Sequence, residues 1–185
     1  CGADEDAVID NRRGSGYPPP LPLRAIHRPA HDCTMIELHA LIQPDCIRHP
    51  LTADDPHGVI RELVQLLHDR NLIADAEETA DAVWAREQQR STGIGEGLAI
   101  PHGRCASLKR VVAAVGWTAA PIDFKSPDDK PVQLIVLIVS PPDDTTNHVQ
   151  ALGAISRKLG HASVRQAAMN SASSEALHDI LCGAD

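Results

Sequence analysis

The sequence predicts an α/β protein built as a layered sandwich, in which helices cover a central sheet. Two short runs, Val111–Val115 and Val132–Val139, are almost continuously apolar. Such runs are typical of strands that are buried on both faces, whereas a strand with one wet face alternates between apolar and polar residues. Many other apolar residues recur at helical spacing, so helices are expected to supply the covering layers.

The first predicted helix follows Asp55, a favourable N-cap, and begins with Pro56, which suits the first helical position. Asn71 marks its expected end. One face of this helix is apolar and is therefore expected to be buried. Its residues are Val59, Ile60, Leu63, Leu66 and Leu67.

A second helix is expected to start after Asp75, because Asp75 and Glu78 resemble a capping box. It should end near Arg90, since each of the glycines that follow would cost about 1 kcal/mol relative to alanine inside a helix. Its apolar stripe consists of Ala76, Ala80, Val83 and Trp84.

Two more helices are predicted near the C-terminus. The first follows Pro141–Asp144, with Asp144, Thr145 or Thr146 as its N-cap. Its apolar residues recur at helical spacing: Val149, Leu152, Ile155 and Leu159. The second covers Ser174–Leu181 and is expected to turn three apolar residues inward. These are Leu177, Ile180 and Leu181.

Residues 1–33 differ in composition from the rest and are predicted to form a flexible, Pro-rich N-terminal segment. They combine acidic residues with Arg12–Gly16 and Tyr17–Pro22, and they hold too little apolar surface to offset the entropy lost on ordering. The proline stretch is interpreted as a spacer, with a docking peptide for an aromatic groove as the alternative. Residues 34–185 are expected to form one folded domain.

Charge and cysteine content argue against several classes of function. The formal net charge is −8, which disfavours nucleic acid or an anionic membrane as the main partner, because both select clustered Lys and Arg. The five scattered cysteines contain no Cys-x-x-Cys pair and indicate reduced thiols. The longest apolar run is far shorter than the ~20 residues that a membrane helix needs. A cytoplasmic protein without membrane insertion is expected, with a lipoprotein that begins at Cys1 as the alternative.

The segment Ser91–Gly97 is a glycine-rich loop with features of an anion site. Gly93 and Gly95 let the backbone turn sharply and bring N–H groups close to a phosphate, and the hydroxyls of Ser91 and Thr92 add donors. A simple turn is the alternative, because the loop has neither the lysine of a P-loop nor the preceding strand of a dinucleotide-binding motif.

His102 is the candidate nucleophile. Pro101 fixes its own φ and biases Ile100 toward an extended conformation, so His102 should emerge in a restricted direction at the end of a strand. Open α/β sheets bind ligands at strand ends of this kind. A neutral imidazole nitrogen can attack phosphorus when a backbone carbonyl holds the other ring nitrogen. The alternative is an ordinary loop histidine with satisfied hydrogen bonds.

Two further residues fit a phosphoryl-transfer site. His148 lies in the first turn of a predicted helix, where the helix dipole helps it to donate a hydrogen bond to a phosphoryl oxygen. Arg86 could neutralise a phosphoryl group, which carries about two negative charges, through its guanidinium fork. Each has a simpler interpretation, an exposed polar side chain for His148 and an ordinary surface arginine for Arg86.

No metal site is expected. His27, His31 and Cys33 have suitable spacing but offer no fourth ligand for a structural zinc ion. A Ser-His-Asp site is not supported either, because the sequence has no Gly-x-Ser-x-Gly elbow. The other histidines are interpreted as solvated surface residues: His39, His49, His57, His68, His161 and His178.

Four short elements are specific enough to indicate a family. They are Arg86–Glu87, Ser91–Gly95, Ala99–Gly103 and Asn147–His148. Together they resemble the enzyme IIA domain of the fructose and mannitol branch of the bacterial sugar phosphotransferase system, over residues 36–181. The resemblance implies a mixed sheet flanked by helices. It also implies that His102 is phosphorylated, that His148 is the second active-site histidine and that Arg86 binds phosphate.

Members of that family accept a phosphoryl group from HPr, a small histidine phosphocarrier, or from its nitrogen-branch counterpart. They pass it to a IIB domain or use its presence as a signal, without a metal or organic cofactor. Three segments are similar to the nitrogen-regulatory IIA proteins: Ile100–Gly103, Pro121–Phe124 and Arg157–Leu159. The predicted function is therefore a stand-alone histidine phosphocarrier with a regulatory role. The alternatives are a fructose or mannitol IIA component of sugar uptake, and a binding module that docks to a regulated protein without phosphate turnover.

Glu96 departs from the family pattern, because many relatives carry a neutral residue there. Its negative charge, expected beside the phosphate, predicts slower phosphorylation or an altered choice of donor.

Overall fold

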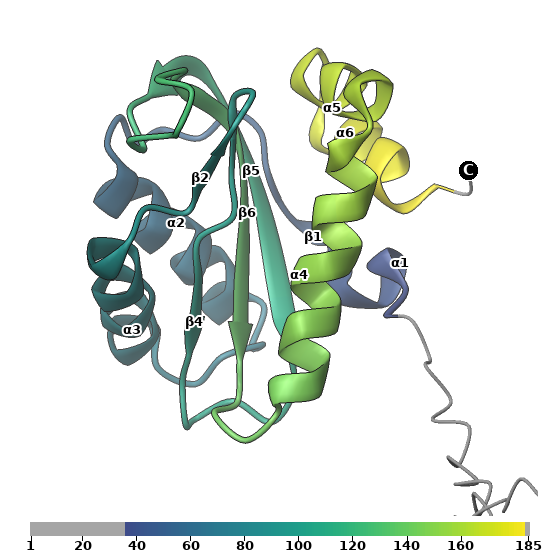
Figure 1. Ribbon diagram of the computed structural model, residues 1–185. Coiled ribbons are helices and arrows are strands. Elements are labelled where there is room, and N and C mark those ends of the chain that lie inside the picture. The colour runs from purple at the N-terminus through teal and green to yellow at the C-terminus, as the bar shows by residue number, and fades with distance from the viewer. Residues whose placement is uncertain (1–35, 184–185) are drawn as a thin grey trace, which may run out of the picture. The chain divides into compact units, whose positions relative to one another are not determined.

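The computed structural model describes residues 36–183, which form one α/β unit (Figure 1). The predicted N-terminal segment, with His27, His31 and Cys33, lies outside the described residues. The elements in chain order are α1 (Leu38–Leu41), β1 (Ile42–Arg48), α2 (Pro56–Asp69), α3 (Ala76–Gln89), β2 (Gly93–Gly95), β3 (Leu98–Ala99), β4 (His102–Arg104), β5 (Val112–Ile122), β6 (Val132–Ser140), α4 (Thr145–Gly160), α5 (Ala162–Met169) and α6 (Ser174–Cys182). None of these helices is both long and apolar enough to span a membrane.

The six strands form one mixed sheet. Its order is β1-β5-β6-β3-β2, and β4 also pairs with β6. The central strands β5 and β6 are antiparallel, whereas β3 and β4 both run parallel to β6. β1 runs parallel to β5, and β2 and β3 form an antiparallel hairpin. The predicted layered α/β architecture is confirmed.

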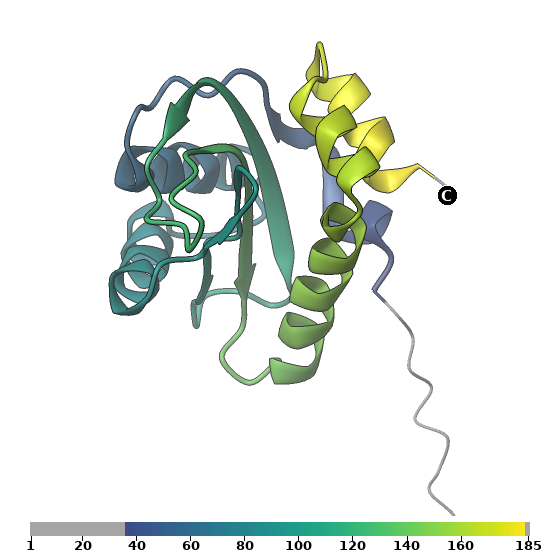
Figure 2. The same cartoon turned by 45° about the horizontal axis from the view of Figure 1, so that its top comes forward.

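Helices cover both faces of this sheet, as Figures 1 and 2 show. α2 and α3 pack on one face, and α1, α4, α5 and α6 pack on the other. The side chains of β6 alternate between the two cores, because successive residues of a strand point to opposite faces. Residues 134–139 are all 0 % exposed, which confirms the prediction that this apolar run is a strand covered on both sides.

The predicted N-caps of α2 and α3 are present. The Asp55 carboxylate accepts a hydrogen bond from the Gly58 N–H (3.0 Å), and the Asp75 carboxylate accepts one from the Glu78 N–H (2.9 Å). α3 ends at Gln89, just before the glycine-containing segment. These boundaries determine which residues of α3 reach the edge of the sheet in its last turn.

The predicted apolar stripe of α4 is wrong at its N-terminal end. Val149 is 59 % exposed, whereas the adjacent His148 is 6 % exposed. The buried face of the helix continues from His148 through Ala151 to Ile155, at the spacing of three and four residues that a helix requires. The interpretation of His148 as an exposed polar side chain is therefore excluded.

The segment around Pro101 also differs from the prediction. We expected one short strand that ends at His102, but β3 ends at Ala99 and β4 starts at His102. Pro101 lies between them and has no N–H to donate. Its carbonyl accepts a hydrogen bond from the Ile138 N–H (3.0 Å), which keeps both short strands aligned on β6. Four further elements were not predicted from the sequence: α1, β1, β2 and α5.

Candidate active site

One pocket collects the three side chains that we predicted for phosphoryl transfer. It has a volume of about 280 Å³ and is lined by Arg86, His102, Gly103, Arg104 and His148. α3 supplies the first of these residues, β4 the next three and α4 the last. The fold therefore brings together groups from three separate parts of the sequence.

The backbone holds one ring nitrogen of His102. Nδ1 lies 2.9 Å from the carbonyl oxygen of Ile100. A carbonyl oxygen can only accept a hydrogen bond, so Nδ1 carries the proton and the lone pair of the neutral ring lies on Nε2. Among the described residues, Nε2 has no hydrogen-bond partner. This is the arrangement that a nucleophilic imidazole needs.

The surroundings of His102 favour the neutral ring. Burial lowers the pKa of His102, and the positive charge of Arg86 lowers it further. The hydrogen bond to the Ile100 carbonyl and the Glu87 carboxylate act in the opposite direction, but the pKa remains below its ordinary value. The lone pair on Nε2 is therefore available at neutral pH.

His148 is held from the other side of the pocket by Ser140, the last residue of β6. Ser140 Oγ and His148 Nδ1 are 2.8 Å apart. Burial lowers the pKa of His148, and His102 and Arg104 lower it further, against the effect of the Asp144 carboxylate. The ring centroids of His102 and His148 are 5.5 Å apart, with an angle of 61° between the ring planes. A group bound to one ring thus lies within reach of the other.

Two arginines place positive charge at the pocket. Arg86 lies in the last turn of α3, and its Nη1 donates to the carbonyl oxygen of Arg90 (2.9 Å). Nη1 of Arg104 donates to the carbonyl oxygen of Pro142 (2.6 Å) and to Oγ1 of Thr145 (2.9 Å). These contacts orient both guanidinium groups and leave other N–H groups of each for an anion.

Gly103 allows α3 to approach β4 closely enough to bring Arg86 to His102. A Cβ atom at Gly103 would lie 2.8 Å from Cγ2 and 3.0 Å from Cα of Val83. The second of these atoms belongs to the backbone of α3, so a larger residue would displace the helix. Gly103 is therefore part of the framework that sets the width of the pocket.

The four residues of the predicted phosphate loop do not line this pocket. Its polar groups form internal hydrogen bonds: the N–H and the hydroxyl of Thr92 donate to the buried carboxylate of Glu87, and the Ser91 hydroxyl donates to the carbonyl of Phe124. Gly93 packs against Ser126, where a Cβ atom would lie 2.4 Å from the Ser126 hydroxyl oxygen. Gly95 has a φ of 95°, which favours glycine. Phosphate binding by these four residues stays a prediction, and their contacts favour a structural role.

The predicted position of Glu96 beside the phosphate is wrong. Glu96 occupies the turn between β2 and β3, six residues before His102, which corresponds to about 20 Å of extended chain. Its carboxylate pairs with Lys130 (2.8 Å) and lies 3.9 Å from Arg165. The charge of Glu96 is therefore balanced at the far end of the hairpin.

Sequence reasoning missed two residues of the site, Arg104 and Ser140. Arg104 could have been found, because residues i and i+2 of a strand share one face and Arg104 is two residues after His102. Ser140 carries no such local signal. Its proximity to the pocket depends on the parallel register of β4 and β6, which pairs Arg104 with Ser140.

Six histidines outside the pocket were predicted to be solvated, and three of them, His39, His68 and His161, are exposed as predicted. His49 stacks on Trp117 with ring centroids 4.4 Å apart, and His57 contacts Trp84 at 4.8 Å. Nε2 of His178 is buried without a hydrogen-bond partner. These three side chains are intermediate in exposure and are therefore only partly solvated. Within residues 36–183, no group of three or more His, Cys, Asp or Glu side chains is arranged to hold a metal ion.

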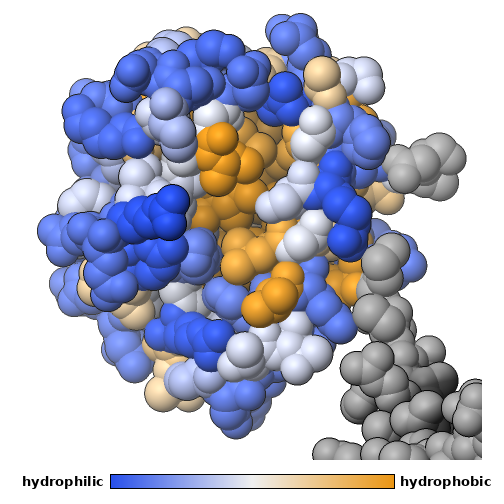
Figure 3. All heavy atoms as spheres, viewed as in Figure 1, coloured by the Kyte–Doolittle hydropathy of each residue, from blue (hydrophilic) through white to orange (hydrophobic). Residues whose placement is uncertain are grey.

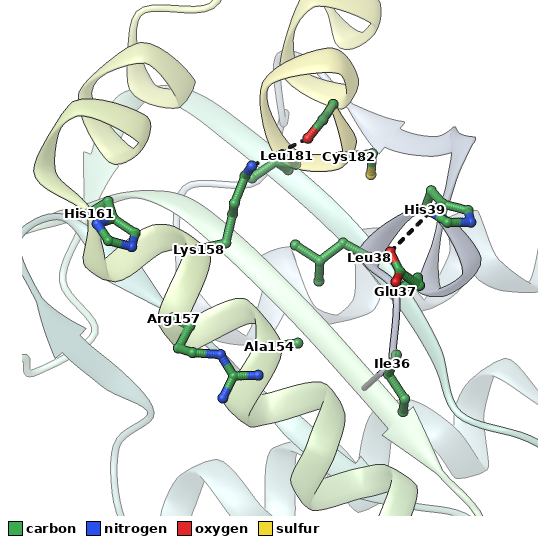
Figure 4. A pocket seen from close by; sticks show the side chains of 11 residues that line it. Ile36, Glu37, Leu38, His39, Ala154, Arg157, Lys158, His161, Leu181 and Cys182 are labelled. Carbon is green, nitrogen blue, oxygen red and sulfur yellow. Dashed lines mark hydrogen bonds and ion pairs between the residues drawn. The ribbon is translucent and has the colours of Figure 1, made fainter. Parts of the chain in front are cut away.

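A second pocket, of about 430 Å³, lies between α1, the C-terminal part of α4 and the end of α6 (Figure 4). Lys158 in its wall donates to the carbonyl oxygen of Gly183 (3.4 Å), and His39 pairs with Glu37 (3.8 Å). None of the predicted site residues lines it. The chemistry described above therefore belongs to the smaller pocket.

Comparison with known families places this chain in a defined class. Residues 40–183 match the family described as phosphoenolpyruvate-dependent sugar phosphotransferase system, EIIA 2. The chain belongs to this family, whose members are phosphotransfer components.

Three relatives show the range of the family. The chain is 33 % identical to a fructose-specific EIIA component of Haloferax volcanii, over 80 % of this chain and 91 % of that protein. The structure is similar to that of nitrogen regulatory protein IIA-Ntr from Neisseria meningitidis, with a TM-score of 0.72, 30 % identity, and coverage of 78 % of this chain and 98 % of the other. It also shares its fold with enzyme IIA mannitol from Escherichia coli in a complex with phosphorylated enzyme IIB, with a TM-score of 0.65, 18 % identity, and coverage of 78 % and 100 %.

Proposed function

We propose that this protein is a histidine phosphocarrier of the phosphoenolpyruvate-dependent phosphotransferase system, and that Nε2 of His102 accepts the phosphoryl group from an HPr-type protein. One observation carries the proposal: the backbone carbonyl of Ile100 holds Nδ1, so the lone pair lies on Nε2 of a ring that lines a pocket with two arginines. The family membership supports the same chemistry.

The transfer exchanges one phosphorus–nitrogen bond for another. The lone pair of His102 Nε2 attacks the phosphorus atom of the donor's phosphohistidine, and the donor ring leaves with the electron pair of the bond that breaks. Nδ1 of His102 keeps its proton throughout. The positive charge that the donor ring loses appears on the ring of His102, where the Ile100 carbonyl stabilises it.

Arg86 and Arg104 have the charge that this step requires. A phosphoryl group carries about two negative charges near neutral pH, and two guanidinium groups line the pocket. His148 lies close enough to donate a hydrogen bond to a phosphoryl oxygen on His102. Groups that are already oriented toward the developing charge lower the barrier without reorganisation during the reaction.

The surface around the pocket suits a protein donor rather than a small molecule. Figure 3 shows hydrophobic side chains gathered in a hollow on this face, between α3 and α4, with hydrophilic residues around it. Val149 is next to His148 and is 59 % exposed. An apolar centre with a polar rim is typical of protein interfaces.

For the acceptor we propose a regulated protein, by analogy with the nitrogen-regulatory relatives. A IIB domain is the second candidate, because the relative with 33 % identity is a fructose-specific EIIA component and the enzyme IIA mannitol structure contains phosphorylated enzyme IIB. Transfer from the labelled protein to a purified fructose-type IIB domain would favour the second candidate, and a stable label in its presence would favour the first.

The experiment for the donor step uses labelled phosphoenolpyruvate, enzyme I and HPr or its nitrogen-branch counterpart. We expect one acid-labile, base-stable phosphohistidine on the wild-type protein and none on His102→Ala. His161→Ala removes an exposed histidine that does not line the pocket and should take up label like the wild type. Undiminished labelling of His102→Ala would contradict the proposal.

A further inference from the structure

Ser140 is a fully buried polar residue at the end of an apolar strand. It is 0 % exposed, and its backbone carbonyl already accepts a hydrogen bond from the Cys105 N–H (3.0 Å). The only hydrogen-bond partner of its hydroxyl within residues 36–183 is Nδ1 of His148, at 2.8 Å. This hydroxyl therefore acts on one ring nitrogen and on no other group of the described chain.

The single proton of the hydroxyl decides the tautomer of His148. If Nδ1 of the neutral ring carried a proton, the ring would donate to Ser140 Oγ, and the hydroxyl proton would be buried without an acceptor. Buried donors without acceptors are costly and rare. Both groups are satisfied only when Ser140 donates to Nδ1, and the proton of His148 then lies on Nε2.

This tautomer is the opposite of the one at His102. The carbonyl of Ile100 keeps the proton of His102 on Nδ1, so its Nε2 has the lone pair. In His148 it is Nε2 that has the N–H. The two rings line one pocket with centroids 5.5 Å apart, so one Nε2 can bond to phosphorus while the other donates to a phosphoryl oxygen.

We propose that Ser140 is a positioning residue for phosphoryl transfer, which holds His148 in the tautomer that donates a hydrogen bond from Nε2 to the phosphoryl group. This inference rests on the proposed phosphocarrier function of the pocket. Ser140 does not touch the phosphoryl group and acts only through His148.

The chain offers a matched control for the loss of a buried hydroxyl. Ser126 is 4 % exposed, and its Oγ has no hydrogen-bond partner. It packs against Gly93 and does not line the pocket. Ser126→Ala therefore removes the same group from a buried site without a change at His148.

The experiment has two arms, applied to the wild type and to Ser140→Ala, Ser140→Thr and Ser126→Ala. In the first arm, ¹⁵N NMR of the unphosphorylated proteins reads which ring nitrogen of His148 is protonated. In the second, rapid mixing with phosphorylated HPr gives the rate of phosphoryl transfer at saturating donor and the donor concentration for half-saturation.

We expect Nε2–H of His148 in the wild type and a mixture of tautomers in Ser140→Ala. The transfer rate of Ser140→Ala should fall about tenfold, because one oriented donor is lost in part of the molecules, while the half-saturating donor concentration stays the same. Ser140→Thr retains a hydroxyl and should keep the wild-type tautomer and rate, as should Ser126→Ala. Amide spectra verify the fold, and Ser140→Cys, a weaker donor, replaces Ser140→Ala if the latter does not fold.

A Ser140→Ala protein with the wild-type tautomer, or with the wild-type transfer rate, would overturn the inference. A wild-type protein that takes up no phosphoryl group would instead contradict the proposed function, and the NMR arm would still decide the effect of Ser140 on His148.

Discussion

The two histidines of the pocket are held by different kinds of contact. Nδ1 of His102 bonds to the backbone carbonyl of Ile100, two residues earlier, whereas Nδ1 of His148 bonds to the side chain of Ser140 on another element. A carbonyl group is present whatever residue occupies position 100, so the tautomer of His102 depends on the backbone conformation at Pro101. The tautomer of His148 depends on the residue at position 140. The tautomer of His102 is thus set by backbone geometry, and the tautomer of His148 by the identity of a side chain.

The largest effect among the variants that keep both histidines is expected from Arg86→Ala, which removes a positive charge beside His102. Removal of one group that stabilises developing charge in an active site typically costs about a hundredfold in rate. We therefore expect a decrease of roughly two orders of magnitude in phosphoryl transfer from HPr, measured by rapid mixing, with the fold retained. Arg90→Ala is the matched control, because Arg90 is exposed, lies four residues later and does not line the pocket. Equal rates for the Arg86 and Arg90 variants would remove Arg86 from the site.

A smaller effect is expected from Gly103→Ala, which tests whether the backbone of β4 sets the width of the pocket. The new Cβ atom would press on the backbone of Val83 in α3, and overpacking of this kind costs about 1–3 kcal/mol in the free energy of unfolding. The transfer rate should decrease as well, because α3 carries Arg86. Urea unfolding and rapid mixing measure the two effects.

Gly153→Ala is the control for this substitution. It lies in α4, and the nearest atom to its new Cβ would be 4.0 Å away. Alanine in place of a helical glycine stabilises a helix by up to about 1 kcal/mol, so the two variants should change stability in opposite directions. If Gly103→Ala leaves both stability and transfer unchanged, the proposed close packing is not what positions Arg86.

The smallest effect is expected from a change of pH, which should alter the free energy of unfolding through both His102 and His148. Burial lowers the pKa of His102 and of His148 in the folded protein, whereas the unfolded chain titrates near the ordinary value of about 6.5. As pH falls below that value, the unfolded state binds protons that the folded state does not, so the free energy of unfolding should decrease down to the lowered pKa values. Well above a pH of about 6.5, the free energy of unfolding should not change with pH through these two histidines.

Urea unfolding at about pH 7.5 and about pH 5.5 measures this dependence. His102→Gln and His148→Gln should each lose less stability between the two pH values than the wild type does. A variant that loses as much as the wild type would show that its histidine has the same pKa in the folded and unfolded states.

Local sequence patterns predicted the layers of the fold but not the register in which the strands pair. The apolar run of β6 and the caps of α2 and α3 are short-range features, and each of them is confirmed. Hydrophobic periodicity failed at Val149, because the first turn of α4 buries a polar residue that lines the pocket, His148, and leaves the adjacent apolar residue exposed. A functional site is where such an exchange is expected.

The candidate site was predicted as far as its sequence motifs extend. His102, His148 and Arg86 line one pocket, although only their convergence is a structural finding and their roles are proposals. Ser140 was not found because its contact with His148 depends on the end of β6 and the start of α4, which no short motif records. The loop Ser91–Gly95 was interpreted from its glycines, but its hydrogen-bonding groups turn inward to Glu87 and Phe124.

The central claim is that Nε2 of His102 accepts the phosphoryl group because the backbone holds Nδ1. The most direct test is NMR of the phosphorylated protein with ¹⁵N-labelled histidine, in which the coupling between phosphorus and nitrogen identifies the bonded atom. We expect phosphorus on Nε2 of His102, with Nδ1 still protonated. Phosphorus on Nδ1 of His102, or on any other histidine, would contradict it.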